Sequence, residues 1–316
     1  MKQPLVVICG VTGCGKTAVS VEVCKKIGGE VISADSMQVY KGMDIGTAKV
    51  RKEETQGIKH YLIDVMDPDE GYSAALFKDM AMNVANEILE KGKFPVVVGG
   101  TGFYINALLY DNDFGNGERD LSVRQKLEKE LAEKGADYLY NELLKIDPVY
   151  AESVHKNNTK RVIRGLEFYR ETGEKFSDHN KNEKLNEPCF NHLIFILNSD
   201  RSTMYERIDR RVDDMIKNGL VDEVKGLLEE GVKRSDVSMQ GLGYKETAAY
   251  LCGEMSLDEA VYTIKRDTRH FAKRQLTWFK HQCKDGIWID VGEFDNDPLK
   301  IAEYMTGIIG EKYGKN

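Results

Sequence analysis

Residues 10–17 read Gly10-Val11-Thr12-Gly13-Cys14-Gly15-Lys16-Thr17 and fit the pattern G-x-x-x-x-G-K-[ST] of a phosphate-binding loop. An apolar run at residues 5–9 precedes the loop and predicts a buried strand, and residues 16–27 follow it and predict a helix. Glycines let backbone N–H groups converge on an anion, and the start of a helix adds positive potential. The stretch therefore predicts a site for a phosphate or a diphosphate. Lys16 adds a charge there and Thr17 a hydroxyl for Mg²⁺, but the motif does not specify a nucleotide.

The rhythm of the sequence around this loop predicts an α/β fold. Residues 5–9, 30–33, 61–63 and 94–98 have strand character, and residues 16–27 and 74–91 have helix character. Alternating strands and helices predict a P-loop parallel sheet flanked by helices on both faces. In such sheets ligands bind beyond the carboxyl ends of the strands.

From residue 112 to residue 190 the strand pattern stops. This part contains charged, amphipathic stretches at residues 122–134, 136–146 and 159–171, and strand character returns at 192–197. We expect a helical insertion domain at 112–190 within a catalytic core formed by 1–111 and 191–316. The alternative is a simple chain of two successive domains, which a further buried parallel strand at 192–197 disfavours.

The C-terminal part is predicted to be mostly helical, with helices at residues 202–218 and 221–230. Ser256 is a good N-cap for a long helix that runs to about residue 281. Val261, Ile264, Ala272, Leu276 and Phe279 form its packing stripe, and Lys265, Arg269 and Lys273 form a basic stripe at i, i+4 spacing.

Composition is that of an ordinary water-soluble protein. No apolar run approaches the roughly 20 residues that cross a bilayer, and no signal peptide is expected. The six cysteines are scattered without a C-x-x-C pair, which argues against a zinc site or a disulfide framework and fits a reducing cytoplasm.

The charge distribution matters more than its sum. A net charge of −7 alone argues against a nucleic-acid partner. Residues 265–284, however, carry seven lysines or arginines opposed only by Asp267, and Lys156, Lys160, Arg161 and Arg164 form a second basic cluster. Such local basic stripes suit a polyanion.

Three further residues are candidates for chemistry. Asp35 directly follows the second strand, where a carboxylate can hold magnesium or act as a base; its structural alternative is a cap on the next turn. Thr101 follows the fourth strand and can donate to a phosphoryl or leaving-group oxygen, or serve as a helix N-cap. Arg211 can clamp an anion, whereas a solvent-exposed helix face explains Arg207 and Arg210 better.

Several motifs together resemble those of bacterial tRNA dimethylallyltransferases. They are the loop at residues 10–17, Asp35-Ser36-Met37-Gln38-Val39-Tyr40, Asp44-Ile45-Gly46-Thr47-Ala48-Lys49, residues 98–104, Gly243-Tyr244-Lys245-Glu246 and residues 268–279. Their order and spacing span nearly the whole chain. The sequence departs from the family at Val11 and Val50, where proline is common, and at Gly13-Cys14, where Ala-Ser is common.

The resemblance implies transfer of a dimethylallyl group from dimethylallyl diphosphate to N6 of adenine 37 in tRNAs reading codons that begin with U. By resemblance, Asp35 accepts the N6 proton and Thr101 hydrogen-bonds the bridging oxygen. Lys16, the N–H groups of the loop, Mg²⁺ on Thr17 and Arg211 would stabilise the leaving diphosphate. The phosphate loop would then hold a leaving group rather than a nucleotide.

The resemblance also implies contacts with the tRNA anticodon stem-loop, whose adenine must leave the base stack. The residues expected to contact tRNA are Asp35, Ser36, Met37, Gln38, Thr101, Arg124, Thr159, Lys160, Arg161, Gly243, Tyr244, Lys245, Lys273, Arg274, Gln275 and Trp278. Of these, Arg161, Lys273 and Arg274 suit phosphates, and Gln38 and Gln275 suit base edges. Trp278 can stack on a base or pack in the core. The protein is expected to act as a monomer, with the insertion domain contacting the anticodon stem.

Three alternatives share the phosphate loop. An isopentenyltransferase acting on free adenosine nucleotides would need neither the insertion nor the basic segment at 273–280. A small-molecule P-loop kinase would not explain the long basic helix. A nucleic-acid-binding ATPase would need a Walker B strand that ends in an acidic residue, and the sequence offers no convincing one.

Overall fold

The computed structural model describes residues 2–110, 121–183 and 186–314. The chain divides into two compact units, the first formed by Met1–Leu109 with Pro188–Asn316 and the second by Tyr110–Glu187. The first unit is formed by two stretches of the chain that lie on either side of the second unit in sequence. The expected boundary at residue 112 lies outside the described residues.

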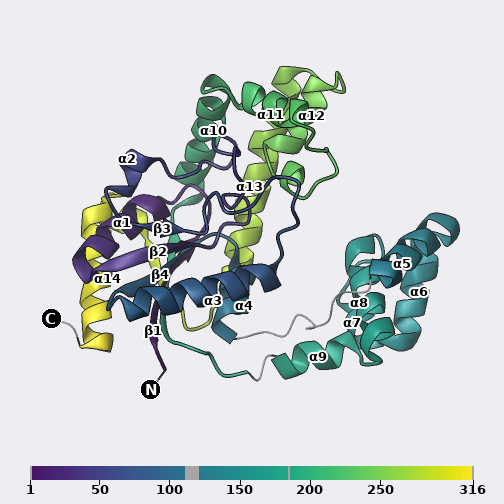
Figure 1. The fold of residues 1–316 in the computed structure, drawn as a ribbon, viewed down its shortest axis with the longest axis horizontal. Helices are drawn as coiled ribbons and strands as arrows, with labels where there is room; N and C mark the ends of the chain where they lie inside the picture. Colours follow the sequence, from purple (N-terminus) through teal and green to yellow (C-terminus); the bar gives the residue numbers. More distant parts are fainter. Residues whose placement is uncertain (1, 111–120, 184–185, 315–316) are drawn as a thin grey trace. The chain divides into compact units, whose positions relative to one another are not determined.

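The first unit is built on a parallel sheet, which confirms the predicted α/β fold class (Figure 1). Within the described residues the strand order is β3-β2-β4-β1-β5-β6, and every neighbouring pair is parallel. The strands are β1 (Pro4–Gly10), β2 (Gly29–Ser33), β3 (His60–Tyr61), β4 (Phe94–Gly99), β5 (Asn191–Asn198) and β6 (Ile287–Asp290). Residues Leu5 to Cys9 are fully buried in the centre of the sheet.

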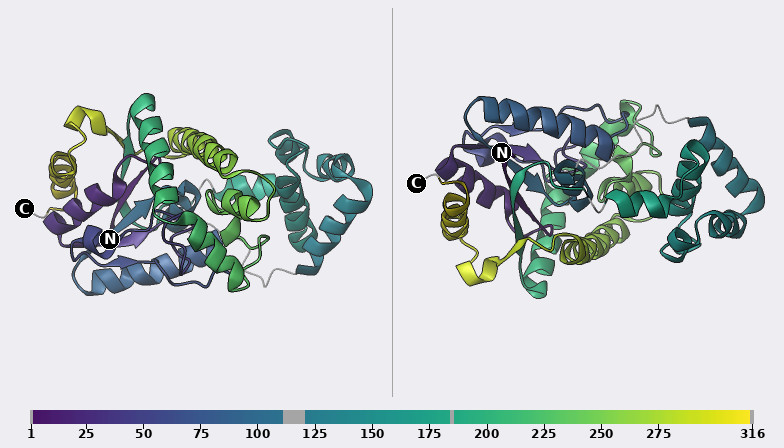
Figure 2. Two further views of the ribbon diagram at one scale, coloured as in Figure 1. Left: turned by 90° about the horizontal axis from the view of Figure 1, so that it is seen from above. Right: turned by 90° about the horizontal axis from the view of Figure 1, so that it is seen from below.

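Helices cover both faces of this sheet (Figure 2). The helix α1 (Lys16–Ile27) packs with α14 (Pro298–Tyr313) against side chains such as Val6, Ile8 and Val96. The helix α3 (Ala74–Glu90) contacts β2 and β4. The connection from β1 to β2 runs toward the β3 edge of the sheet, and the connection from β3 to β4 runs toward the β6 edge. Because such crossovers are right-handed, the helices that they contain, α1 and α3, lie on opposite faces.

The remaining α-helices of the first unit lie between β2 and β3 or follow β4 and β5 in the chain. They are α2 (Lys52–Thr55), α4 (Gly102–Tyr110), α10 (Arg201–Lys217), α11 (Leu220–Glu229), α12 (Tyr244–Leu251) and α13 (Leu257–Gln282). Ser256 caps α13, as the sequence predicts, and exchanges hydrogen bonds with Glu259 in a capping box. The sequence analysis did not predict β6, because a strand of four residues has too short an apolar run to be recognised. It gave no separate helix at α14 (Pro298–Tyr313).

The second unit is helical in the residues that the structure describes. Its helices are α5 (Leu121–Lys134), α6 (Ala136–Ile146), α7 (Pro148–Glu152), α8 (Thr159–Thr172) and α9 (Phe176–Glu183). They enclose a small core that includes Leu127, Leu139, Leu143 and Leu166. This unit therefore has an apolar core of its own.

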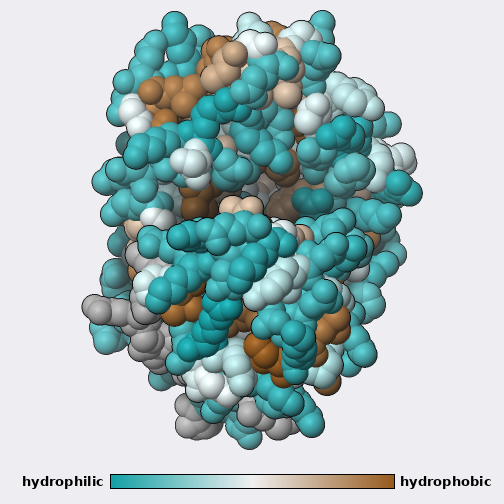
Figure 3. All heavy atoms as spheres, turned by 90° about the vertical axis from the view of Figure 1, so that its right-hand side faces the viewer, coloured by the Kyte–Doolittle hydropathy of each residue, from teal (hydrophilic) through white to brown (hydrophobic). Residues whose placement is uncertain are grey.

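One face of the molecule can be judged for polarity in a space-filling view. The face shown in Figure 3 is mainly hydrophilic, and its hydrophobic residues form small, separate areas. No helix in the described part of the chain is long and apolar enough to cross a membrane.

Candidate functional site

The phosphate-binding loop joins β1 to α1 in a conformation that its glycines allow. Gly13 and Gly15 have φ values of 87° and 79°, a region that glycine enters at little cost. A Cβ atom at Gly10 would lie 2.1 Å from the carbonyl oxygen of Leu197, so the loop starts in close contact with β5. Contact with β5 therefore fixes the start of the loop. The first turn of α1, whose backbone N–H groups favour anions, follows directly after the loop.

Lys16 lies across this loop. Its Nζ donates hydrogen bonds to the carbonyl oxygens of Val11 at 2.9 Å and Gly10 at 3.2 Å. Burial lowers the pKa of the Lys16 ammonium, because desolvation disfavours the charged form. A bound anion would oppose this effect, so the site gains a favourable interaction when it is filled.

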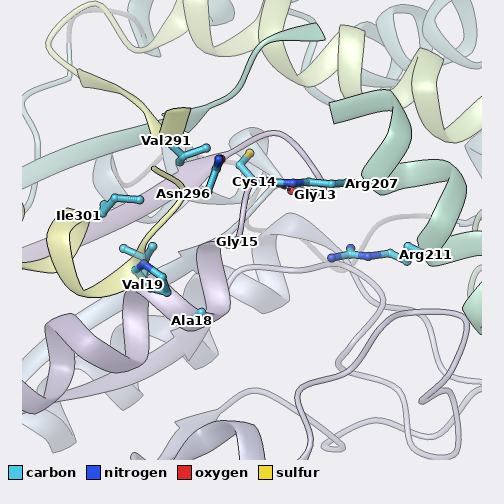
Figure 4. Close-up of a pocket in the computed structure, with 11 residues that line it drawn as sticks. Gly13, Cys14, Gly15, Ala18, Val19, Arg207, Arg211, Val291, Asn296 and Ile301 are labelled. Atoms are coloured by element: carbon cyan, nitrogen blue, oxygen red, sulfur yellow. Dashed lines mark hydrogen bonds between the residues drawn. The ribbon is translucent and has the colours of Figure 1, made fainter. Parts of the chain in front are cut away.

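Two arginines extend from α10 toward the loop (Figure 4). Arg211 Nη1 donates to the hydroxyl of Thr12 at 3.4 Å, and Arg207 Nη1 donates to the carbonyl oxygen of Gly13 at 3.4 Å. Both line a cavity of about 290 Å³ beside Gly15. The sequence assigned Arg207 to a solvent-exposed face, and that interpretation is wrong; Arg210 is exposed as expected.

Asp35 caps the turn that follows β2. Its Oδ1 accepts the backbone N–H of Met37 at 2.9 Å and that of Gln38 at 3.4 Å. The structural alternative for Asp35 is thus realised, but it leaves Oδ2 outside this turn. The same side chain lines the larger pocket of the site, so capping and chemistry are compatible.

This larger pocket has a volume of about 390 Å³ and connects the phosphate loop with the basic helices. Thr12, Asp35, Thr101 and Arg211 line one part of it. The rest of the wall includes Ser36, Met37, Gly46, Thr47, Ala48, Gln240, Gly241, Tyr244, Lys245, Phe271, Arg274 and Gln275. The residues that the sequence places at the carboxyl edge of the sheet therefore meet in one pocket.

Gln275 has a different environment from the one expected of a base-reading side chain. It is buried, its Oε1 accepts the N–H of Thr12 at 2.9 Å, and its Nε2 donates to the carbonyl oxygen of Gly100 at 3.0 Å. Both polar atoms of the amide are engaged within the protein. The structure thus favours a positioning role for Gln275, next to Thr101.

Trp278 packs against the start of α4. A Cβ atom at Gly102 would lie 2.1 Å from the indole ring, so the ring and the backbone are in close contact there. Trp278 also makes an edge contact with Phe279. These contacts favour packing over stacking on a base.

The other tRNA contacts predicted in the first unit also differ in how far they are exposed. Tyr244 is fully buried and donates from its hydroxyl to Glu223 Oε1 at 2.6 Å. Gly243 has a φ of 93° and precedes α12, and Lys245 is exposed. Ser36, Met37 and Gln38 are half-buried, and the Gln38 amide donates to the carbonyl oxygens of Thr47 and Ala48 at 3.3 Å each.

The basic stripe of α13 is only partly directed to solvent. Lys265 forms an ion pair with Asp213 at 2.6 Å, and Arg269 binds both oxygens of Asp209 at 2.6 and 2.8 Å. These two residues hold α13 to α10. Lys273 and Arg274 are exposed, so they suit an external polyanion.

The other predicted tRNA contacts lie in the second unit. Thr159, Lys160 and Arg161 form the first turn of α8, which Asn158 caps by accepting the N–H of Arg161. Arg124, on α5, pairs with Glu128 at 3.0 Å and lies 3.7 Å from Glu167. Lys160 and Arg161 are exposed, and Arg124 is held by carboxylates of its own unit.

The described residues contain no cluster of three or more His, Cys, Asp or Glu side chains that could hold a metal ion. The hydroxyl of Thr17, exposed at the start of α1, is the donor that the phosphate loop offers. Mg²⁺ commonly keeps several waters and binds through one or two protein groups plus substrate phosphates. The donor set therefore fits Mg²⁺ that arrives with a diphosphate.

Three features define the class of protein. They are a parallel α/β core with a phosphate-binding loop, a pocket that joins this loop to a carboxylate, and basic side chains at the pocket. The protein is a P-loop enzyme that acts on a phosphate-bearing substrate. Comparison with known proteins gives the family. The sequence model of the IPP transferase family matches residues 38–282, and the chain belongs to this family. The resemblance found in the sequence is thereby confirmed.

Individual relatives agree over nearly the full length. The chain is 52% identical over 310 residues to the tRNA dimethylallyltransferase of Lachnoclostridium phytofermentans, covering 98% of each protein. It is 43% identical, with a TM-score of 0.73, to the crystal structure of the tRNA isopentenylpyrophosphate transferase from Bacillus halodurans, covering 98% of both chains. A eukaryotic dimethylallyltransferase acting on tRNA is 32% identical with a TM-score of 0.82, covering 98% of this chain and 80% of that one.

Proposed function

We propose that this protein transfers the dimethylallyl group of dimethylallyl diphosphate to N6 of adenine 37 in tRNAs that read codons beginning with U. The observation that carries the proposal is the 390 Å³ pocket. Thr12 and Arg211 contribute phosphate-binding groups to it, Asp35 and Thr101 line its wall, and Arg274 adds positive charge. Donor and acceptor can therefore meet in one place.

Diphosphate is the leaving group of this reaction. The C–N bond forms at N6 while the C–O bond to the diphosphate breaks, and the proton leaves N6. Lys16, the loop N–H groups and Arg211 stabilise the charge that develops on the diphosphate, and Thr101 donates to the bridging oxygen. Thr17 would hold Mg²⁺ together with the diphosphate, and the ion supplies further charge neutralisation when bound.

Asp35 is the residue that suits the proton transfer. The exocyclic amine of adenine is a weak nucleophile because its lone pair is delocalised into the ring. A carboxylate that accepts the N6 proton as the C–N bond forms lowers the activation barrier, and such proton transfer typically raises the rate by about 10²–10⁴-fold. The hydrogen bonds from Met37 and Gln38 hold the Asp35 carboxylate at the pocket while it does so.

The tRNA partner is supported by the basic side chains and by the named relatives. Lys273 and Arg274 in the first unit and Lys160 and Arg161 in the second are exposed. Such side chains suit the phosphates of an anticodon stem-loop, and the adenine must be flipped out of its stack to enter the pocket. We expect the enzyme to act as a monomer in the cytoplasm.

The test is incubation with dimethylallyl diphosphate, Mg²⁺ and unmodified tRNA, followed by mass spectrometry of the digested RNA. We expect one added C5H8 unit on adenine 37 and none on free AMP. Transfer to AMP alone would instead identify an enzyme of free nucleotides. Phosphorylation of a small molecule from ATP without prenyl transfer would identify a kinase.

A further inference from the structure

The carboxylate of Glu223 lies at the centre of an unusual set of donors. Its Oε2 accepts the backbone N–H groups of Asp44 at 2.9 Å and Ile45 at 2.7 Å. Its Oε1 accepts the N–H of Gly46 at 3.1 Å and the hydroxyl of Tyr244 at 2.6 Å. Glu223 belongs to α11, more than 170 positions away from this segment. A carboxylate that accepts several N–H bonds is held firmly, because charged acceptors make the stronger hydrogen bonds.

The segment held in this way forms part of the pocket. Gly46, Thr47 and Ala48 line the same 390 Å³ pocket as Asp35. Ala48 has a φ of 49°, which is costly for a residue with a Cβ atom and persists only where the surroundings impose it. The shape of this wall therefore depends on side chains from outside the segment.

Tyr244 also contacts this segment directly. A Cβ atom at Gly46 would lie 2.5 Å from the Tyr244 ring, so the backbone lies directly on the ring at this glycine. Burial and the neighbouring charge of Glu223 raise the pKa of the Tyr244 hydroxyl, which therefore stays protonated and donates throughout the working pH range. Glu223 and Tyr244 join the wall to the helices α11 and α12.

The opposite side of the segment is held by residues that follow β2. Gln38 donates to the carbonyl oxygens of Thr47 and Ala48 at 3.3 Å each, and Gln38 follows Asp35 by three positions. Lys49 is buried and donates to the carbonyl oxygen of Tyr40 at 2.8 Å. A displacement of the segment would therefore also displace groups next to Asp35.

We infer that Glu223 is a positioning residue for the adenine-binding wall of the pocket. The inference rests on the proposed function. Its carboxylate fixes the N–H groups of residues 44–46 and so holds Gly46, Thr47 and Ala48 in place for the acceptor. It does not touch the phosphate loop. Its effect therefore falls on the acceptor rather than on dimethylallyl diphosphate.

The decisive variant is Glu223→Gln, which keeps the size of the side chain. The amide NH₂ group would face N–H donors instead of accepting from them, so part of the hydrogen-bond set is lost. We expect kcat/KM for tRNA to fall by about tenfold or more, with KM for dimethylallyl diphosphate changed by less than about twofold. Tyr244→Phe removes one donor and keeps the backbone bonds, so it should give a smaller change in the same direction.

The matched control is Glu229→Gln, the same substitution at an exposed position of the same helix. It should leave both kinetic constants unchanged. A second readout is amide hydrogen exchange in the free protein. Protection of residues 44–46 should fall in Glu223→Gln but not in Glu229→Gln, while the melting temperature and the exchange of the central strands change little.

The outcomes separate the two proposals. Unchanged tRNA kinetics in Glu223→Gln, or an equal rise of both KM values with a general loss of protection, would overturn the positioning role. If Glu223→Gln does not fold, the Tyr244→Phe variant gives the same comparison. If the wild-type protein transfers no prenyl group to tRNA, the proposed function fails, and hydrogen exchange at 44–46 alone decides whether Glu223 holds the segment.

Discussion

Gln275 and Thr12 are 263 positions apart in the chain, yet the Gln275 Oε1 accepts the backbone N–H of Thr12 at 2.9 Å. The other end of the same amide donates to the carbonyl oxygen of Gly100, next to Thr101. One buried side chain thus joins the phosphate loop to the loop after β4. Because it comes from α13, the helix that also carries Arg274, it couples the basic helix to the diphosphate site.

We expect Gln275→Leu to impair the use of dimethylallyl diphosphate. The change leaves the Gly100 carbonyl oxygen and the Thr12 N–H without this partner, and losing such buried bonds costs about 1–3 kcal/mol. Steady-state kinetics should show kcat/KM for dimethylallyl diphosphate reduced by about tenfold to a hundredfold. Gln282→Leu, at an exposed position of the same helix, is the control. A loss confined to KM for tRNA would instead support the base-reading role expected from the sequence.

A second prediction concerns the arginines of α10. Arg211→Ala removes a cation that reaches Thr12, and Arg207→Ala removes one that reaches Gly13. Charge-assisted hydrogen bonds to a diphosphate are strong, so each variant should weaken binding of inorganic diphosphate by about tenfold or more. Isothermal titration calorimetry measures this directly. Arg210→Ala on the same helix should bind normally, and equal weakening in all three variants would argue for a general charge effect.

The sequence predicts most of the sheet because those strands are local apolar runs between loops of characteristic composition. The strand expected at 61–63 shares only Tyr61 with β3. The predicted strand at residues 94–98 and the observed Phe94–Gly99 differ by a single residue. The strand β6 is different, since only its pairing with β5 makes four residues a strand. Its parallel register with β5 cannot be read from Ile287–Asp290 alone.

The difference between local patterns and long-range contacts also explains which site residues could be located from the sequence. Asp35 and Thr101 follow strands, and topology alone brings such positions to one edge. The contacts of Gln275, Arg207 and Glu223 join residues that are far apart in the chain, and no local pattern encodes them. Tyr244 shows the reverse case, because a motif marks it as a tRNA contact although its ring is fully buried.

The lowered pKa of Lys16 gives a pH prediction. Because burial lowers the pKa of this ammonium, the free site loses its charge at a lower pH than an ordinary lysine does. Affinity for inorganic diphosphate should therefore decline as the pH rises through this lowered pKa, and it should be retained below it. Lys16→Arg keeps its charge over the whole range, so its weaker residual binding should be flat on the alkaline side. A wild-type profile that stays flat up to the pKa of a free lysine would contradict the prediction.

Asp35→Asn separates the two roles of this residue. Asparagine can still accept the N–H of Met37, so the turn should persist and the melting temperature should change little. It cannot take up the N6 proton, so kcat should fall on the order of 10²-fold or more. Single-turnover assays with saturating tRNA and dimethylallyl diphosphate measure this step. Near-normal turnover in the folded variant would falsify the assignment of Asp35 as the base.

Binding of tRNA should depend on salt because the exposed cations displace counterions from RNA phosphates. Lys273→Gln or Arg274→Gln should each lower the slope of log K against log salt by about one. Lys265→Gln is the matched control on the same helix, since Lys265 is already paired with Asp213 at 2.6 Å and has little charge to offer a phosphate. Filter binding over a range of salt concentrations gives these slopes. Equal slopes for the wild type and the Lys273 and Arg274 variants would show that tRNA binds elsewhere, because a phosphate contact at either position necessarily contributes to the slope.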